Sequence, residues 1–441
     1  MQLKRLFVAA ALLASGAVMA QERKVAFERY TLPNGLTVIL HQDRTAPVVA
    51  VTALYHVGSK DEDSSRTGFA HFFEHLLFEG SENIKRGEFD KYVTNAGGAL
   101  NANTSQDRTF YYELLPSNQL ELGLWLESER MMHAKIEDIG VNTQREVVKE
   151  EKRQRVDNQP YGSIITEILK RAFRQNSYRW APIGSMDHLN QAQLSEFIAF
   201  YKKYYVPNNC VLSIAGDFDV AKTKELIAAY FGAIPKGGNI PRPDMTEPAL
   251  GAEVRDVIED NIQLPAVIQA YRAPAQGSDE YYAFNVLSEI LSGGASSRMN
   301  RVMVDEKQIA LAALSAPFFN ESAGLFITYA IANGGTQPEA MEVVIDSLVE
   351  DVKKNLVSER EFQKVRTSIE TDFVTRNGSM AGIAESLANY QVYFGDANLI
   401  NTEIERYRKV TREDVMAVAK KYLNKNNRVV LYYVPKGKKG W

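Results

Sequence analysis

Ahead of residue 60, hydrophobic and polar residues alternate with the period of strands that are buried on one face. Two such runs, 27–32 and 36–40, flank an Asn-Gly turn, a combination typical of a β-hairpin. A third run, 48–57, predicts another strand. It leads through a polar loop into the strongly apolar run 68–78, for which we expect a buried helix.

Strand-like and helix-like runs then follow one another through the rest of the first half. The helical period is clearest in residues 117–133, where leucines recur on one side. The expected strands are 99–104, 108–115 and 208–215, and the expected helices are 88–95, 117–133, 142–156, 193–205 and 220–231, with a helical stretch after Pro160.

A segment rich in proline and glycine interrupts this pattern. Residues 234–247 carry three prolines and two glycines and show neither a helical nor a strand period. We interpret them as a linker. The sequence therefore predicts an N-terminal domain at 21–233 and a C-terminal domain at 248–441.

The composition fits a globular protein of two or three domains, because the 441 residues are 45% hydrophobic and 24% charged. The formal net charge of −4 argues against a nucleic-acid partner, which would favour a basic face. The single cysteine, Cys210, lies in a strand-like run and can form no internal disulfide.

Residues 1–20 have the pattern of a secretory signal peptide. Lys4 and Arg5 precede a short apolar core, and Val18-Met19-Ala20 provides the small residues of a cleavage site. The core is too short for a permanent membrane span, although an N-terminal anchor is the alternative. No later segment resembles a membrane span, so we expect no membrane partner. We expect a secreted protein in the periplasm of a Gram-negative bacterium.

Two histidines and a glutamate lie within the apolar run 68–78. On a helix, His71 and His75 project from one face because they are four residues apart. Two imidazoles at this spacing can bind zinc, and Glu74 can reach a water molecule at such a metal. The motif, His-x-x-Glu-His, is the inverse of the commoner zinc-helix motif. The alternative is a core helix with hydrogen-bonded histidines.

The second domain repeats features of the first. Residues 202–212 align with 420–430, and residues 47–51 align with 265–269, both at an offset of 218. Two matches at one offset indicate a duplicated domain. At this offset the two histidines and the glutamate are replaced by Glu289, Ser292 and Gly293. Only the first domain is therefore expected to hold a metal.

A further carboxylate with a candidate role lies in the helix expected at 142–156. The apolar positions of this helix are Val147 and Val148, and Glu151 follows three and four residues later, on the same side. Glu150 falls on a different, charged face. An inward carboxylate needs a partner, and a metal ion is one candidate, an arginine or a backbone group the other.

These residues together resemble the pitrilysin family of zinc peptidases, which includes insulin-degrading enzyme and mitochondrial processing peptidase. The helix with His71 and His75 matches the inverted zinc motif of that family. The family's third ligand lies in a Val-x-x-x-Glu pattern, which Val147-Val-Lys-Glu-Glu151 matches here. The resemblance therefore implies that Glu151 is the third zinc ligand.

The resemblance also implies a fold and a substrate site. The fold is α+β, with two similar domains, each a mixed, mainly antiparallel β-sheet backed by helices. An edge strand of the first sheet would bind the peptide substrate as an added strand. The residues of that strand would be Asn101, Ala102, Asn103 and Thr104.

The implied function is that of a secreted zinc metalloendopeptidase acting on extended or unfolded peptides. His71, His75 and Glu151 would hold Zn²⁺, and Glu74 would act as a general base toward water. A non-catalytic peptide-binding or assembly subunit of the same family is the alternative. A structural zinc protein is a third interpretation, which leaves the general base without a use.

The sequence differs from that of active family members in two respects. Gln144 stands where many relatives have a glutamate, seven residues before the third ligand. Val304 and Leu311 stand where active relatives have an Arg/Tyr pair that helps to bind the substrate. Because single-chain relatives contain four such domains, we expect a dimer. It would be a heterodimer with a homologous subunit that carries the Arg/Tyr pair, or alternatively a homodimer.

Overall fold

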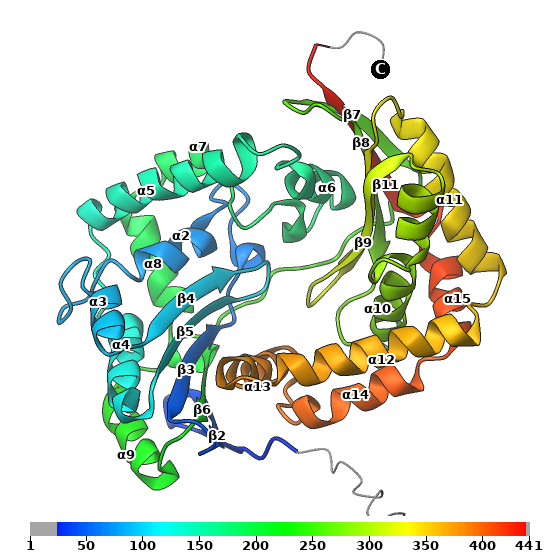
Figure 1. Ribbon diagram of the computed structural model, residues 1–441. Coiled ribbons are helices and arrows are strands. Elements are labelled where there is room, and N and C mark those ends of the chain that lie inside the picture. The colour runs from blue at the N-terminus through cyan, green and yellow to red at the C-terminus, as the bar shows by residue number, and fades with distance from the viewer. Residues whose placement is uncertain (1–23, 438–441) are drawn as a thin grey trace, which may run out of the picture.

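The computed structural model describes residues 24–437, and the predicted signal peptide, residues 1–20, lies outside this range. The chain folds into two α+β halves, and each half is built on one mixed β-sheet with helices packed against it (Figure 1). The predicted fold class is confirmed.

The first sheet has six strands in the order β1-β2-β6-β3-β5-β4. Strands β2 and β6 are parallel, and the other neighbours are antiparallel, including the predicted hairpin of β1 and β2. The strands are β1 (Glu28–Thr31), β2 (Thr37–Gln42), β3 (Val48–Tyr55), β4 (Ala99–Thr104), β5 (Thr109–Pro116) and β6 (Cys210–Gly216).

The second sheet repeats this arrangement. Its order, β7-β11-β8-β10-β9, reproduces the order of the first sheet without β1, and β7 and β11 form its parallel pair. Strand β8 begins 218 residues after β3, in agreement with the internal alignment. The strands are β7 (Val254–Asp260), β8 (Ala266–Ala273), β9 (Ala310–Phe319), β10 (Gly324–Ala332) and β11 (Arg428–Pro435).

Most helices of the first half lie close to their predicted positions. The helix expected at 142–156 starts earlier, as α5, and continues as a π-helical turn, Arg153–Asp157. The helices are α2 (Phe69–Leu76), α3 (Phe89–Asn95), α4 (Leu120–Met132), α5 (Asp138–Lys152), α6 (Ile164–Ala172), α7 (Met186–Gln191), α8 (Leu194–Tyr204) and α9 (Val220–Phe231).

Within the described residues, the second half contributes six α-helices of 11 to 18 residues. They are α10 (Asp279–Ser292), α11 (Pro338–Lys354), α12 (Glu359–Arg376), α13 (Met380–Phe394), α14 (Leu399–Lys409) and α15 (Arg412–Tyr422). Between α9 and β7, in a stretch that includes the expected linker 234–247, the described chain forms neither helix nor strand. Within residues 24–437, no helix combines the length and apolarity needed to cross a bilayer.

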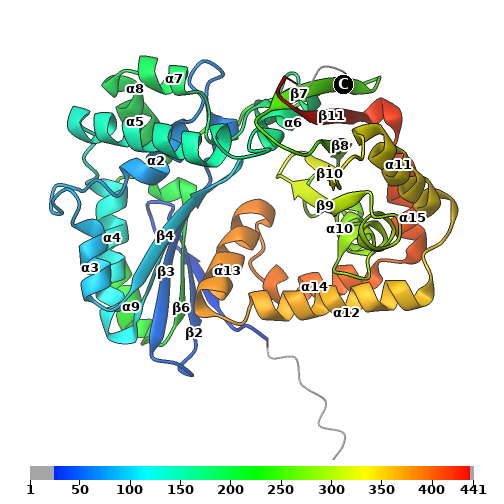
Figure 2. The ribbon, with the colours of Figure 1, turned by 45° about the horizontal axis from the view of Figure 1, so that its top comes forward.

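Each half covers one face of its sheet with its own helices and the other face with a helix from the opposite half. Helix α13 packs on β3 and β6 of the first sheet, and α6 packs on β8 and β11 of the second (Figures 1 and 2). Leu387 of α13 belongs to one buried apolar cluster with Ile39 and Leu54 of the first sheet. Leu169 of α6 belongs to another with Ile268 and Leu431 of the second sheet. Because both contacts are buried and apolar, the two halves share their cores.

A polar contact at the tip of the β9–β10 hairpin also joins the halves. The carboxylate of Glu321 lies 2.8 Å from Nε2 of His56 and contacts the ammonium group of Lys60, which is buried. Asp107 accepts a hydrogen bond from the Glu321 amide at 2.8 Å. Burial opposes ionisation, but His56 and Lys60 lower the pKa of Glu321 to about 2. The hairpin tip is therefore held in the first half by a charged carboxylate.

Shared cores predict that the two halves unfold together. Leu387→Ala should lower the free energy of unfolding by about 2–5 kcal/mol, because it opens a cavity between α13 and the first sheet. Urea titrations should show the fluorescence of Trp125 and Trp180, both in the first half, changing in the same transition as the far-UV circular dichroism. Val374→Ala, at an exposed position of α12, is the control. Two separate transitions in the wild-type protein would contradict shared cores.

Candidate metal centre

Helix α2 carries both histidines of the predicted motif, and its aromatic face fixes it in the core. Phe69 stacks on Phe197 and Phe73 on Phe200, both from α8, with ring centroids 4.6 and 5.3 Å apart. The helix begins after Gly68, whose φ of +100° is a conformation that favours glycine. The position of the histidines thus follows from packing on α8.

A buried carboxylate closes the N-terminus of α2. Glu62 accepts hydrogen bonds from the backbone amides of Gly68 (2.9 Å) and Ala70 (2.8 Å) and from the indole of Trp180 (3.1 Å). These bonds satisfy amides that a helix N-terminus leaves open. Burial raises the pKa of Glu62 to about 8. The carboxylate fixes the point at which α2 begins.

A buried arginine holds the opposite end of α2. Arg130 donates a hydrogen bond to the carbonyl oxygen of Leu77, just after the helix, over 3.0 Å. Its guanidinium group lies 3.0 Å from Glu127 and 3.4 Å from Glu113, and these three side chains are fully buried. Burial and the neighbouring Glu127 raise the pKa of Glu113 well above its usual value. Both ends of α2 are therefore fixed by buried ionisable groups.

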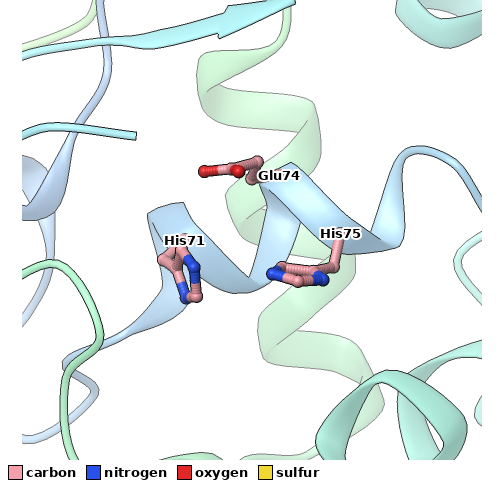
Figure 3. Close-up of side chains that lie close together, drawn as sticks. All are labelled: His71, Glu74 and His75. Carbon is pink, nitrogen blue, oxygen red and sulfur yellow. The ribbon is translucent and has the colours of Figure 1, made fainter. Parts of the chain in front are cut away.

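The motif residues come together as their spacing predicted. His71 and His75 project one turn apart from α2, and Glu74 leaves the turn between them (Figure 3). The atoms of the three side chains that could bind a metal lie within 4.8 Å of one another. His71 is buried, whereas Glu74 and His75 are half-buried. The cluster can therefore be reached by a water molecule or a substrate.

Glu151 of α5 lies opposite the two histidines. Its Oε2 atom is 3.0 Å from Nε2 of His75 and 3.5 Å from Nε2 of His71, and these imidazoles lower the pKa of Glu151 well below its usual value. Its side chain is 15% exposed, against 51% for Glu150, so the predicted inward orientation of Glu151 is confirmed. Of the two valines used to predict it, Val148 is buried but Val147 is exposed.

The three side chains fit a zinc ion. Ligand atoms that lie ~2.0–2.1 Å from a tetrahedral zinc ion are about 3.3 Å from one another. The distances from Oε2 of Glu151 to the two imidazole nitrogens, 3.0 and 3.5 Å, bracket this value. Its Oε2 atom is buried and makes no hydrogen bond of good geometry with any described residue. One buried carboxylate oxygen and two imidazole nitrogens together form the donor set of a zinc site.

The predicted substrate strand is β4, at the edge of the first sheet. Among the described residues it pairs on one side only, with β5, and α2 packs beside it. Asn101 and Asn103 are exposed, and Ala102 and Thr104 are half-buried. The unpaired edge offers main-chain groups with which an added strand could pair. Its role in substrate binding stays a prediction.

The positions that depart from the family pattern lie in both halves. Gln144 of α5 donates a hydrogen bond to Glu79 at 2.5 Å. Val304 is half-buried in a π-helical segment, Asn300–Glu306, and Leu311 is exposed on β9. Neither aliphatic side chain can replace the charge of an arginine or the hydroxyl group of a tyrosine.

Sequence reasoning missed the residues that hold α2. Glu62 and Arg130 act through contacts with distant parts of the chain, so no local period reveals them. The sequence did contain one sign of this network, because Glu113 is a carboxylate inside the strand-like run 108–115. A carboxylate at such a position indicates a buried polar network.

Comparisons with known proteins agree with this fold. Residues 37–183 match the family model described as Insulinase (Peptidase family M16), and residues 191–369 match the model described as Peptidase M16 inactive domain. Two repeated α+β domains with one inverted zinc motif define the class of inverted-motif zinc peptidases. The chain belongs to the insulinase family, peptidase family M16.

The relatives cover nearly the whole chain. The zinc protease PqqE of Helicobacter pylori is 31% identical over 429 residues, or 96% of each chain. A protein of Arabidopsis thaliana, described as a probable mitochondrial-processing peptidase subunit beta, is 22% identical and aligns over 89% of this chain and 75% of its own.

Solved structures show the same fold. A protease from Helicobacter pylori superimposes with a TM-score of 0.89 and 30% identity over 93% of this chain and 100% of its own. The periplasmic protease PqqL from Escherichia coli has a TM-score of 0.75 and 18% identity, and this chain covers 48% of its length. At that identity the likeness to PqqL concerns the fold alone.

Proposed function

We propose that this chain is an exported zinc metalloendopeptidase that hydrolyses extended peptides. The observation that carries the proposal is the convergence of His71, His75 and Glu151 from two helices, with Glu74 beside them. The relatives named zinc proteases support the same class of activity. The signal-like residues 1–20 support export to the periplasm.

The side chains of the cluster divide the chemistry between them. His71, His75 and Glu151 would hold zinc, which when bound acidifies a water molecule and polarises a peptide carbonyl. Glu74 is not needed as a ligand, so its carboxylate is free to accept the proton of the attacking water. It then returns that proton to the amine of the leaving peptide. The half-buried position of Glu74 allows both transfers.

The edge of β4 supports the choice of an extended substrate. A peptide added beside Asn101–Thr104 would form main-chain hydrogen bonds, which depend little on its sequence. Helix α2 packs against β4, so a peptide bound along this strand would pass near the cluster. Binding of this kind suits unfolded peptides better than folded proteins.

A non-catalytic peptide-binding subunit is the second candidate function. Val304 and Leu311 favour it, because aliphatic side chains there cannot bind a substrate carbonyl. The intact set of three ligands and Glu74 favours the peptidase. Turnover of an unstructured peptide by the wild-type protein separates the two functions.

Replacing the general base should separate metal binding from catalysis. Glu74→Gln should retain zinc but lower the rate of peptide cleavage by ~10²–10⁴-fold, because glutamine cannot accept the proton of water. Zinc content and cleavage of an unstructured peptide are measured on the same preparation. A variant that cleaves at nearly the wild-type rate would exclude Glu74 as the base.

Replacing the third ligand should release the metal. Glu151→Gln should sharply lower zinc content, because it removes the anionic ligand that faces both imidazoles. Glu150→Gln, one residue away on the exposed face, should retain zinc. Metal analysis of the two purified variants decides the assignment. Equal retention would rule out Glu151 as a ligand, and loss in Glu150→Gln alone would reverse the roles.

We also propose that the active form is a heterodimer with a homologous subunit that carries the Arg/Tyr pair. A homodimer is the alternative, but both of its copies would have Val304 and Leu311. One comparison supports pairing, because the Arabidopsis thaliana relative is described as a subunit.

The partner can be tested by reconstitution. The purified chain should cleave peptide slowly by itself and faster after addition of a homologous chain with the Arg/Tyr pair and no His-x-x-Glu-His motif. Size-exclusion chromatography with light scattering then shows whether a mixed dimer forms. Full activity of the isolated chain, unchanged by the companion, would refute the heterodimer.

A further inference from the structure

We propose that Arg155 is a positioning residue that keeps Glu151 bound to the metal through one oxygen only. The inference rests on the proposed zinc site. Lys149, Lys152 and Arg153 form ion pairs with other carboxylates. The guanidinium group of Arg155 faces Glu151 itself. Arg155 would thereby keep one coordination position free for water or substrate.

The two oxygens of Glu151 have different partners. Oε2 faces the imidazoles of His71 and His75, at 3.5 and 3.0 Å. Oε1 lies 2.8 Å from a guanidinium nitrogen of Arg155. The carboxylate therefore presents one oxygen to the histidines while the other is engaged by a cation.

The local backbone places Arg155 at this position. The residue lies four positions after Glu151, the spacing at which a glutamate pairs well with a following cation. It belongs to the π-helical turn Arg153–Asp157, and π-helical turns within helices are frequent at functional sites. The neighbouring cations pair elsewhere: Lys152 with Asp157, and Arg153 with Glu150.

The choice between one and two oxygens matters for a catalytic zinc. Such sites have three protein ligands and leave a fourth position for water or substrate. A carboxylate can also bind a metal through both oxygens, and the second oxygen would then compete for that position. By holding Oε1, Arg155 prevents this competition.

The ion pair between Arg155 and Glu151 contributes little to the stability of the fold. The side chain of Arg155 is 78% exposed, and exposed pairs contribute little to stability. Residues that orient metal ligands typically change metal affinity or activity when they are replaced. The effect of Arg155 is therefore expected at the metal rather than in the stability of the fold.

The test compares Arg155→Gln with Arg153→Gln, which removes an equivalent ion pair in the same turn, and with Arg155→Lys, which restores a cation. Each protein is loaded with Co²⁺ in place of zinc, because visible absorption of cobalt is strong at four-coordinate sites and weaker at five-coordinate ones. Zinc content, kcat and KM for an unstructured peptide are measured in parallel.

For Arg155→Gln we expect retained metal, weaker cobalt absorption, and a kcat ~10–100-fold lower with little change in KM. Arg155→Lys should recover part of the absorption and of kcat, and Arg153→Gln should match the wild type. Unchanged cobalt absorption, or an effect confined to KM, would overturn the inference.

The outcome is distinguishable from failure of the proposed function. If the wild-type protein binds cobalt but cleaves no peptide, the peptidase proposal fails while the absorption of Arg155→Gln still decides the role of Arg155. If the wild-type protein binds neither zinc nor cobalt, the zinc site and the inference fall together.

Discussion

The burial of Arg130 between Glu113 and Glu127 is the interaction on which the arrangement of the cluster depends. A charge removed from water is tolerated only where partners surround it, and breaking such a pair typically costs about 3–5 kcal/mol. Arg130 meets this condition by contacting both carboxylates and the carbonyl oxygen of Leu77. The end of α2 is thereby tied to α4 and β5, so the histidine-bearing helix has one orientation.

The second constraint is the position of α5, because Glu151 reaches the histidines from that helix. Arg145 of α5 donates hydrogen bonds to the carbonyl oxygens of Leu189 (3.0 Å) and Ala192 (3.3 Å), at the end of α7. These contacts tie α5 to α7, and α5 also packs against α2. The candidate zinc site is thus a product of helix packing, and local motif geometry supplies only two of its three ligands.

The sequence predicted those features that depend on local spacing. The pair His71 and His75 could be placed because residues four apart share a helix face, and the strand β8 could be placed from its offset to β3. The orientation of Glu151 was correct, although only Val148 supported it. The roles of Glu62 and Arg130 and the exchange of α6 and α13 could not be predicted, because contacts between distant segments leave no period in the sequence.

The exchange of α6 and α13 bears on how such a chain originated. An ancestor consisting of one half, folded by itself, would have left both an apolar sheet face and an apolar helix in water. Two copies that exchanged this helix would have buried both surfaces in a domain-swapped homodimer. Fusion of the two genes would then have preserved every contact while freeing one copy to lose its metal ligands. In this account, the present interface between the halves was once an interface between two subunits, which are now joined in one chain.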